Sequence, residues 1–344
     1  MPASVAAFVS GPGELELRET AEPVVGPGLA AVRVSLCGIC GSDVASWRTG
    51  RLHPAVFGHE WAGQVVAVGQ DVDVVTVGDR VVMAAPPPCG TCGFCRVGLA
   101  EECQHVQEVV TGEGPAPPSH GGFASSVTVL ASRLMRVPAS VSDEAAAMLE
   151  PTAVVVHGLL RCPAPLGRSV VVLGAGPIGL LTTAVARAMG ATQIIVVERR
   201  RRGLATRMGA TTVLAAGPGV PSAVDELTGG MGADLVVECT GVPALVGPAG
   251  KLARRGGTLL LLGFPKVASE IEIGAWMHKQ LRVFAALTYV RSDFDVGLRL
   301  IEQGLLDPSP LHTGTGGLGE LESILRNLDS DAPEHVKALI DPRR

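Results

Sequence analysis

The hydrophobic pattern divides the chain into a β-rich first part and an α/β second part. Up to about residue 140, short runs rich in β-branched residues recur between turn residues. They predict strands at 3–9, 29–36, 61–68, 80–83 and 124–129. Strands at this spacing are typical of a barrel or a sandwich. Two segments that are apolar on most faces then predict helices at 143–149 and 153–160.

From residue 168 onward, strand and helix patterns alternate. Continuous apolar runs, as in buried parallel strands, predict strands at 169–173, 193–198, 234–238 and 257–263. Helices are predicted between them at 177–189 and 202–208. This βαβ series predicts a parallel sheet. The tail, with helices predicted near 295–303 and 318–328 and a strand at 335–340, is expected to return to the first domain.

Composition narrows the class of protein. With 344 residues, 47% of them hydrophobic, the chain can form two domains with sizeable cores. Its net charge of −5 argues against a nucleic-acid partner. No apolar run reaches the roughly 18 residues of a membrane span, and the first residues do not resemble a signal peptide. We therefore expect a cytoplasmic protein that acts on a small molecule, without a nucleic-acid or membrane partner.

Four closely spaced cysteines predict a metal site. The spacing Cys89-x2-Cys92-x2-Cys95-x7-Cys103 suits one tetrahedral Zn²⁺. Disulfides are the weaker alternative, because the chain is long, has 8 cysteines and shows no secretory leader. Four thiolates leave no open coordination position, so this zinc would be structural. Prolines and glycines around the loop suggest that it wraps the metal without helix or strand.

A glycine-rich turn predicts a dinucleotide site. A G-x-G-x-x-G motif follows the buried strand at 169–173 and opens the next helix, as a dinucleotide fingerprint requires. The candidate cofactor-binding residues of this turn are Gly174, Gly176, Pro177, Ile178 and Gly179. Glu198 ends the second strand, where an acid binds the ribose hydroxyls of NAD. Arg199 and the three arginines after it could instead pair with the 2′-phosphate of NADP, but the acid favours NAD.

Two further segments carry metal-ligand chemistry, Cys37-Gly38-Ile39-Cys40-Gly41-Ser42-Asp43 and Gly58-His59-Glu60-Trp61-Ala62-Gly63. Together with the cysteine loop and the glycine turn, they resemble the zinc-dependent medium-chain dehydrogenases, closest to the polyol (sorbitol-type) and threonine dehydrogenase branches. The resemblance covers nearly the whole chain in order. Its other motifs are Val77-Gly78-Asp79-Arg80-Val81, Gly121-Gly122-Phe123-Ala124, Glu150-Pro151-Thr152-Ala153 and His157-Gly158.

The resemblance implies a fold, a domain layout and a mode of assembly. An α/β fold is expected, with an N-terminal GroES-like β-barrel catalytic domain and a Rossmann domain with a doubly wound parallel sheet. The catalytic domain would comprise residues 1–152 and 290–344, and the Rossmann domain residues 153–289. The family also implies a homodimer or homotetramer.

The resemblance also implies the chemistry. Two Zn²⁺ per chain are expected, one structural and one catalytic. The catalytic zinc would be held by Cys40 and His59, with Glu60 and Glu150 nearby and either carboxylate able to ligate. It would act as a Lewis acid on an alcohol or ketone whose hydride is exchanged with the nicotinamide. Ser42 resembles the hydroxyl that passes the alcohol proton outward.

Weaker candidates lie near the cofactor. Thr240 and Leu262 end predicted Rossmann strands, where they are placed to touch a dinucleotide. Lys337 resembles the family's cation near the pyrophosphate, although a surface lysine beside a strand is an equal alternative.

The chain departs from its relatives in the proton relay. Ala45 stands where a histidine often passes the proton to solvent, and His53 is a possible substitute. A Cys37–Cys40 redox pair is a competing idea for the first segment. Two alternative functions stay open: a zinc-free quinone or enoyl reductase of the same superfamily, and a non-catalytic dinucleotide-binding protein.

Overall fold

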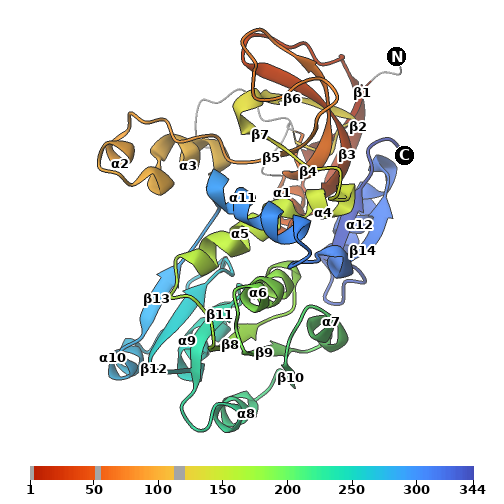
Figure 1. Cartoon of the computed structure of the whole chain (residues 1–344). Helices are drawn as coiled ribbons and strands as arrows, with labels where there is room; N and C mark the ends of the chain where they lie inside the picture. Colours follow the sequence, from red (N-terminus) through yellow and green to blue (C-terminus); the bar gives the residue numbers. More distant parts are fainter. Residues whose placement is uncertain (1–3, 51–55, 112–120) are drawn as a thin grey trace. The chain divides into compact units, whose positions relative to one another are not determined.

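The computed structural model describes residues 4–50, 56–111 and 121–344. The chain divides into two compact units (Figure 1). The first unit comprises Met1–Glu150, Val290–Leu298 and His312–Arg344, and the second comprises Pro151–Tyr289 and Arg299–Leu311. The segment Arg299–Leu311 therefore belongs to the second unit, although we expected all of 290–344 in the first.

The first unit is built on a seven-stranded sheet, with the order β14-β15-β3-β4-β5-β7 and β6 paired to β3. Strands β1 and β2 form a separate antiparallel pair. The strands of this unit are β1 (Ser4–Gly11), β2 (Glu14–Thr20), β3 (Leu29–Gly38), β4 (Glu60–Val68), β5 (Arg80–Met83), β6 (Ser126–Leu130), β7 (Leu134–Arg136), β14 (His312–Gly316) and β15 (Lys337–Ile340). The tail thus returns to this sheet through β15, which pairs antiparallel with β3.

The first unit also contains short helices. They are α1 (Gly41–Thr49), α2 (Gly93–Arg96), α3 (Gln104–Thr111), α4 (Asp143–Ala147) and α12 (Leu321–Leu328), with 3₁₀ turns at Ala100–Glu102, Ala131–Arg133 and Leu318–Glu320. The core is centred on Trp61 and Phe123, and α12 adds Leu321 and Leu325 to it. A buried apolar stripe of this kind, more than helix propensity, stabilises short helices.

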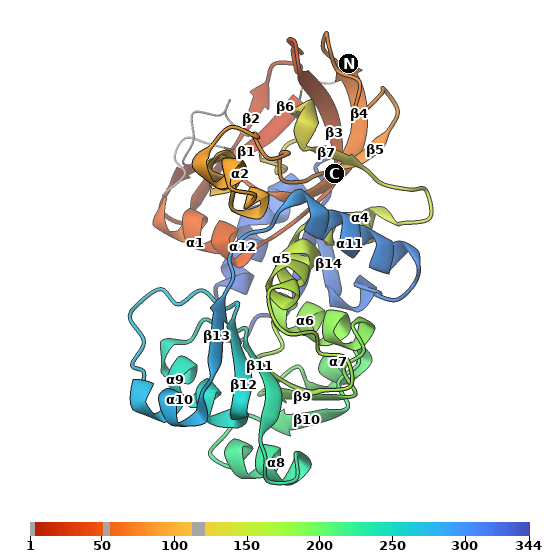
Figure 2. The same cartoon turned by 60° about the vertical axis from the view of Figure 1, so that its left-hand side comes forward.

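The second unit is a six-stranded parallel sheet with the order β10-β9-β8-β11-β12-β13. Its strands are β8 (Ser169–Leu173), β9 (Gln193–Glu198), β10 (Thr212–Ala215), β11 (Ala233–Glu238), β12 (Ala253–Leu261) and β13 (Arg282–Ala285). The strand order reverses between β8 and β11, as in doubly wound folds. The predicted parallel α/β domain is confirmed, and Figure 2 shows β13 at the edge of its sheet.

The helices of the second unit are α6 (Pro177–Ala188), α7 (Arg202–Arg207), α8 (Val220–Leu227), α9 (Pro243–Leu252) and α10 (Ile273–Lys279), with a 3₁₀ turn at Ser309–Leu311. Two helices, α5 (Leu149–Leu160) and α11 (Arg291–Glu302), cross the boundaries between the units. Side chains of α8, α9 and α10 share one core with alternate residues of the sheet. On the opposite face, Gly158 of α5 lies beside Leu260. Of the helices in the described part of the chain, none is long and apolar enough to cross a membrane.

Candidate functional site

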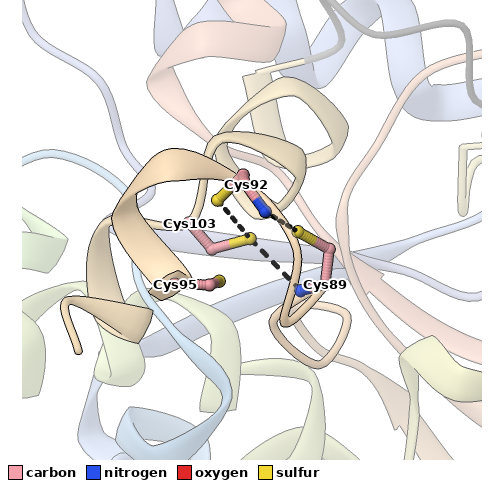
Figure 3. Close-up of side chains that lie close together, drawn as sticks. All are labelled: Cys89, Cys92, Cys95 and Cys103. Carbon is pink, nitrogen blue, oxygen red and sulfur yellow. Dashed lines mark hydrogen bonds between the residues drawn. The ribbon is translucent and has the colours of Figure 1, made fainter. Parts of the chain in front are cut away.

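The four predicted cysteines come together in one loop of the first unit. Cys89, Cys92, Cys95 and Cys103 place their sulfur atoms within 4.8 Å of one another (Figure 3). We had expected this loop to contain no helix or strand, but it contains helical turns. Helix α2 carries Cys95, and a 3₁₀ turn precedes Cys103. These turns point the sulfurs inward, because a helical turn reverses the chain over a few residues.

The surroundings of the four sulfurs favour the thiolate at Cys89 and disfavour it at Cys95. The N–H groups of Cys92 and Cys89 donate to the sulfurs of Cys89 and Cys103, each at 3.3 Å. Hydrogen bonds from Thr91 lower the pKa of Cys89 to about 6, whereas desolvation raises the pKa of Cys95 to about 12. A cation at the centre would stabilise all four as thiolates, because a bound metal deprotonates its thiol ligands outright. The four-sulfur set fits zinc by ligand type and number.

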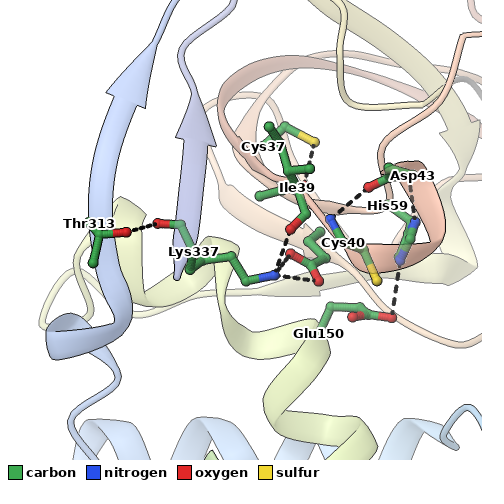
Figure 4. Close-up of polar contacts among 10 residues, drawn as sticks. Cys37, Ile39, Cys40, Asp43, His59, Glu150, Thr313 and Lys337 are labelled. Carbon is green, nitrogen blue, oxygen red and sulfur yellow. Dashed lines mark hydrogen bonds and ion pairs between the residues drawn. The ribbon is translucent and has the colours of Figure 1, made fainter. Parts of the chain in front are cut away.

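A second group of potential metal ligands lies where β3 ends and β4 begins. Cys40 precedes α1, Glu60 is the first residue of β4, and His59 comes immediately before it. Ligand atoms of these three residues lie within 4.8 Å of one another. Glu150, the fourth predicted residue, lies with its carboxylate 4.0 Å from Nε2 of His59 (Figure 4). The structure therefore brings together all four residues that were predicted around the second zinc.

Asp43 is the residue that sequence reasoning missed in this group. It is buried, and its Oδ1 lies 3.5 Å from Nδ1 of His59 while its Oδ2 accepts a hydrogen bond of 2.9 Å from the N–H of Cys40. Desolvation lowers the pKa of His59, but the charge of Asp43 and its hydrogen bond outweigh it and raise that pKa well above the ordinary value. A carboxylate on Nδ1 orients the ring and leaves Nε2 available to a metal. The sequence did contain a signal for Asp43. It is an acid three residues after the candidate ligand Cys40, in the first turn of a helix.

Lys337 forms a buried ion pair with Glu60. Its Nζ lies 2.8 Å and 2.5 Å from the two carboxylate oxygens of Glu60 and donates to the carbonyl oxygen of Ile39 at 3.0 Å (Figure 4). Burial lowers the pKa of Lys337, but the negative charge of Glu60, with smaller contributions from Cys40 and Glu150, raises it above the ordinary lysine value. We had predicted Lys337 near the pyrophosphate. The structure gives its ammonium group partners inside the first unit, and the role in cofactor binding stays a prediction.

The predicted relay residues lie on and near α1. Ser42 is exposed in the first turn of this helix, and Ala45 follows one turn later. His53 falls outside the described residues. Cys37 is fully buried in the core of the first unit, where its thiol lies within 3.6 Å of the carbonyl oxygen of Gly38.

The glycine turn of the second unit has the conformation that its sequence predicts. Gly174 has a φ of 92°, which is in the left-handed region that favours glycine. A Cβ on Gly179 would overlap the carbonyl oxygen of Gly174, so helix α6 can approach the turn only with glycine there. A Cβ on Gly176 would meet no atom within 4 Å. That open space at the start of α6, with Pro177 and Ile178 in its first turn, fits a phosphate bound by the N–H groups of the helix.

Glu198 is held against this turn. Its carboxylate accepts hydrogen bonds from the N–H of Ala175 at 2.7 Å and of Arg200 at 2.9 Å. Desolvation raises the pKa of Glu198, but these backbone donors outweigh it and lower the pKa below the ordinary value. Arg199 is exposed beside it. Both elements of cofactor choice, the acid and the arginine, therefore lie at the end of β9.

The other two cofactor candidates lie at the ends of β11 and β12. The side chain of Thr240 packs against Gly174, where a Cβ on the glycine would lie 2.7 Å from Cγ2 of Thr240. Leu262 is buried and packs on Gly158 of α5, so this residue presents its backbone more than its side chain to a ligand.

Comparison with known proteins identifies the family. The model of the zinc-binding dehydrogenases matches residues 177–303, and that of the alcohol dehydrogenase GroES-like domain matches residues 26–139. The chain is similar to 2-dehydro-3-deoxy-L-galactonate 5-dehydrogenase of Pseudoalteromonas atlantica, with 33% identity over 325 residues that cover 92% of this chain and 93% of the relative. It is also similar to sorbitol dehydrogenase of Bacillus subtilis, with 30% identity over 352 residues and coverage of 98% and 97%.

A solved structure gives the same result. A zinc-binding dehydrogenase of Sinorhizobium meliloti 1021, crystallised with NADP bound, superimposes with a TM-score of 0.86 at 29% identity and covers 99% of this chain and 100% of its own. The chain belongs to the zinc-binding medium-chain alcohol dehydrogenase family. It is an NAD(P)-dependent zinc dehydrogenase that acts on CH–OH groups, of the polyol and sugar dehydrogenase type. The expected GroES-like and Rossmann domains are confirmed.

The Lys337–Glu60 pair gives a stability prediction. Lys337→Met should lower the free energy of unfolding by about 3–5 kcal/mol, because it leaves a buried carboxylate without its cation. The pKa of Lys337 is raised, so the pair should contribute fully at neutral pH, and its contribution should be lost only as pH rises above the ordinary lysine value of about 10.4. Denaturant unfolding measures both effects.

The exposed pair Glu322–Arg326 of the same unit provides the control. Arg326→Met should cost about 1 kcal/mol or less. If Lys337→Met and Arg326→Met lower the free energy of unfolding equally at neutral pH, the buried pair is no more important than the exposed one.

Proposed function

We propose that the protein is a zinc- and NAD-dependent dehydrogenase that interconverts a secondary alcohol and a ketone on a polyol, cyclitol, aminocyclitol or sugar. The observation that carries this proposal is the group formed by Cys40, His59 and Glu60, whose ligand atoms lie within 4.8 Å of one another. Cys40, His59 and one carboxylate, from Glu60 or Glu150, would leave one position open, which is what a catalytic zinc needs. The names of the sugar and sorbitol dehydrogenases among its relatives support the substrate class.

Each residue has a defined role in this proposal. Cys40 and His59 would hold a Zn²⁺ that polarises the oxygen of the substrate when bound. Glu60 and Glu150 are the candidates for a third protein ligand. Lys337 neutralises Glu60 on both oxygens, which favours Glu150 as the freer carboxylate. Asp43 orients His59, and Ser42 accepts the proton of the alcohol.

The four-cysteine loop would hold the second, structural zinc. Its cysteines fill every position of a tetrahedral ion, so no substrate can bind there. The turn at Gly174, Gly176 and Gly179, with Pro177 and Ile178, would bind the pyrophosphate. Glu198 would bind the ribose, with Thr240 and Leu262 as further contacts. The nicotinamide carries the hydride, and the chain supplies its position.

The two alternative functions make different demands on the first unit. A zinc-free quinone or enoyl reductase needs no ligand group, and a non-catalytic dinucleotide-binding protein needs no orienting acid on a ligand histidine. The convergence of Asp43 on His59, with Glu150 at 4.0 Å from the same ring, supports the zinc dehydrogenase over both. A spectrophotometric screen of secondary alcohols and ketones with NAD(H) and NADP(H) tests the proposal. If the protein turns over none of them, the proposal is overturned.

We propose assembly into a homodimer or homotetramer through β13. This strand ends its sheet, and among the described strands only β12 pairs with it. Val283 on β13 and Met277 on the neighbouring α10 are 43% and 72% exposed, so the edge is apolar as well as open. Sedimentation velocity of the intact protein tests this, and a monomer at all concentrations would refute it. We also propose the cytoplasm as its location, because its eight cysteines form no disulfide bonds.

The metal content is the first prediction. The intact chain should hold two zinc ions, and Cys95→Ser should hold one and unfold more easily, because the structural ion stabilises its loop. His59→Ala should abolish turnover with little effect on stability. Elemental analysis and thermal unfolding measure these effects, with Cys162→Ser as a control outside both groups. One zinc ion in the intact chain would contradict the two-site proposal.

Cofactor choice is the second prediction. The wild type should prefer NAD, and Glu198→Ala should raise the use of NADP relative to NAD, because Arg199 would then face the 2′-phosphate without a competing acid. Arg199→Ala is the matched control, and it should lower the use of NADP without impairing NAD. Steady-state kinetics with both cofactors measure the ratio. A wild type that prefers NADP would show that the arginines dominate.

The proton relay is the third prediction. Ser42→Ala should lower turnover by roughly 10²-fold, within the range of general acid–base assistance, with both zinc ions retained. Ser46→Ala, one turn along the same helix, should have little effect. Ala45→His should change the pH dependence of turnover by restoring a titratable group. Full turnover of Ser42→Ala across the pH range would exclude Ser42 as the relay.

A further inference from the structure

A buried carboxylate in the second unit has no part in the chemistry described so far. Glu238 is the last residue of β11 and is 0% exposed. Among the described residues it has no cationic partner, and its hydrogen bonds come from the chain that follows it. Burying a charge is costly unless hydrogen bonds satisfy it, so the cost of this carboxylate calls for a physical reason.

The carboxylate binds the turn that follows its own strand. One oxygen accepts hydrogen bonds from the N–H of Thr240, at 2.7 Å, and from the hydroxyl of Thr240. The other oxygen accepts from the N–H of Gly241 at 3.2 Å. Three donors therefore converge on one side chain and define the conformation of this turn.

The same residue also binds the turn that follows β12. Its carbonyl oxygen accepts from the N–H groups of Leu262 and Gly263, at 2.9 and 2.8 Å. A Cβ on Gly263 would overlap both the Glu238 carboxylate and the backbone of Gly241. The two turns approach each other closely at Gly241 and Gly263, with the Glu238 carboxylate beside them.

Contact extends to the glycine turn after β8, because Thr240 packs against Gly174. Strands β8 and β11 are the neighbours at which the strand order reverses, and dinucleotides bind across that point at the carboxyl ends of the strands. Glu198, on β9, lies on the side that would receive the adenosine half. The turns after β11 and β12 lie on the other side and would receive the nicotinamide half.

We propose that Glu238 is a positioning residue for the nicotinamide half of the cofactor. It holds the Thr240–Gly241 and Leu262–Gly263 turns in the shape that this half requires, without touching it. The inference rests on the proposed function, since it needs a nicotinamide cofactor at this sheet. A role of this kind explains why a charge is kept where an apolar side chain would cost less to bury.

Two probes separate the halves of the cofactor. ADP contains the adenosine half alone, and NADH contains both. Glu238→Gln, which removes the charge at nearly constant size, should weaken NADH binding about tenfold or more and leave the Kd of ADP within about twofold. Asp234→Asn is the matched control, because Asp234 lies at the opposite end of β11 and also accepts a backbone hydrogen bond, from Ser169 at 3.0 Å. It should lower stability and leave both Kd values unchanged.

The outcomes are distinguishable by fluorescence titration and calorimetry on the zinc-loaded protein. If Glu238→Gln weakens the binding of NADH and ADP equally, or weakens neither, the positioning role is overturned. Should that variant not fold, Glu238→Asp keeps the charge but shortens the side chain that reaches the N–H of Gly241, and it should show the same selective loss of NADH binding. A wild type that binds ADP but neither NADH nor NADPH would instead overturn the proposed function.

Discussion

The ion pair between Lys337 and Glu60 joins β15, near the end of the chain, to the start of β4 at the place where the chemistry is proposed. The two residues are 277 positions apart in sequence, and both are almost fully buried. Lys337 also donates to the carbonyl oxygen of Ile39, and the N–H of Ile39 donates to the carbonyl oxygen of Ala338 at 3.1 Å. The segment that leads into Cys40 is therefore fixed by the last strand of the chain. Without that strand, the ligand group would lose both its charge balance and its backbone support.

Much of the fold could be predicted because hydrophobic periodicity reports burial. The strands β5, β8 and β9 begin and end at the residues predicted, since each is a run of apolar residues bounded by turns or charges. The ligand residues could be predicted as a set because cysteine, histidine and acids in those spacings have few structural roles. The glycine turn was recognisable because Gly174 and Gly179 meet steric requirements that the structure displays, and Gly176 leaves open space beside the helix.

The missed elements share a physical cause, which is that tertiary packing overrides local preference. Strand β2 (Glu14–Thr20) carries four charged residues and is set by pairing with β1. Helix α9 contains Pro248, Gly247 and Gly250 and is held by burial against the sheet, with Trp276 over Gly250. Asp43 left only a short local spacing as its signal, whereas Lys337 acts through Glu60, 277 positions away in sequence, which no local pattern reveals.

The two units organise their ligand groups by different means. In the first unit, side chains from distant segments converge, and buried charges on Asp43, Glu60 and Lys337 fix their geometry. In the second unit, backbone N–H groups provide the contacts, so glycine and close approach matter more than charge. Glu198 and Glu238 are the exceptions there, because their carboxylates accept hydrogen bonds from the N–H groups of backbone turns. Rigid charge networks suit a metal, whose ligands must meet at one point, whereas backbone turns suit a long, flexible dinucleotide. The first unit therefore uses buried charges, which suit the proposed metal ion, and the second uses backbone turns, which suit the proposed dinucleotide.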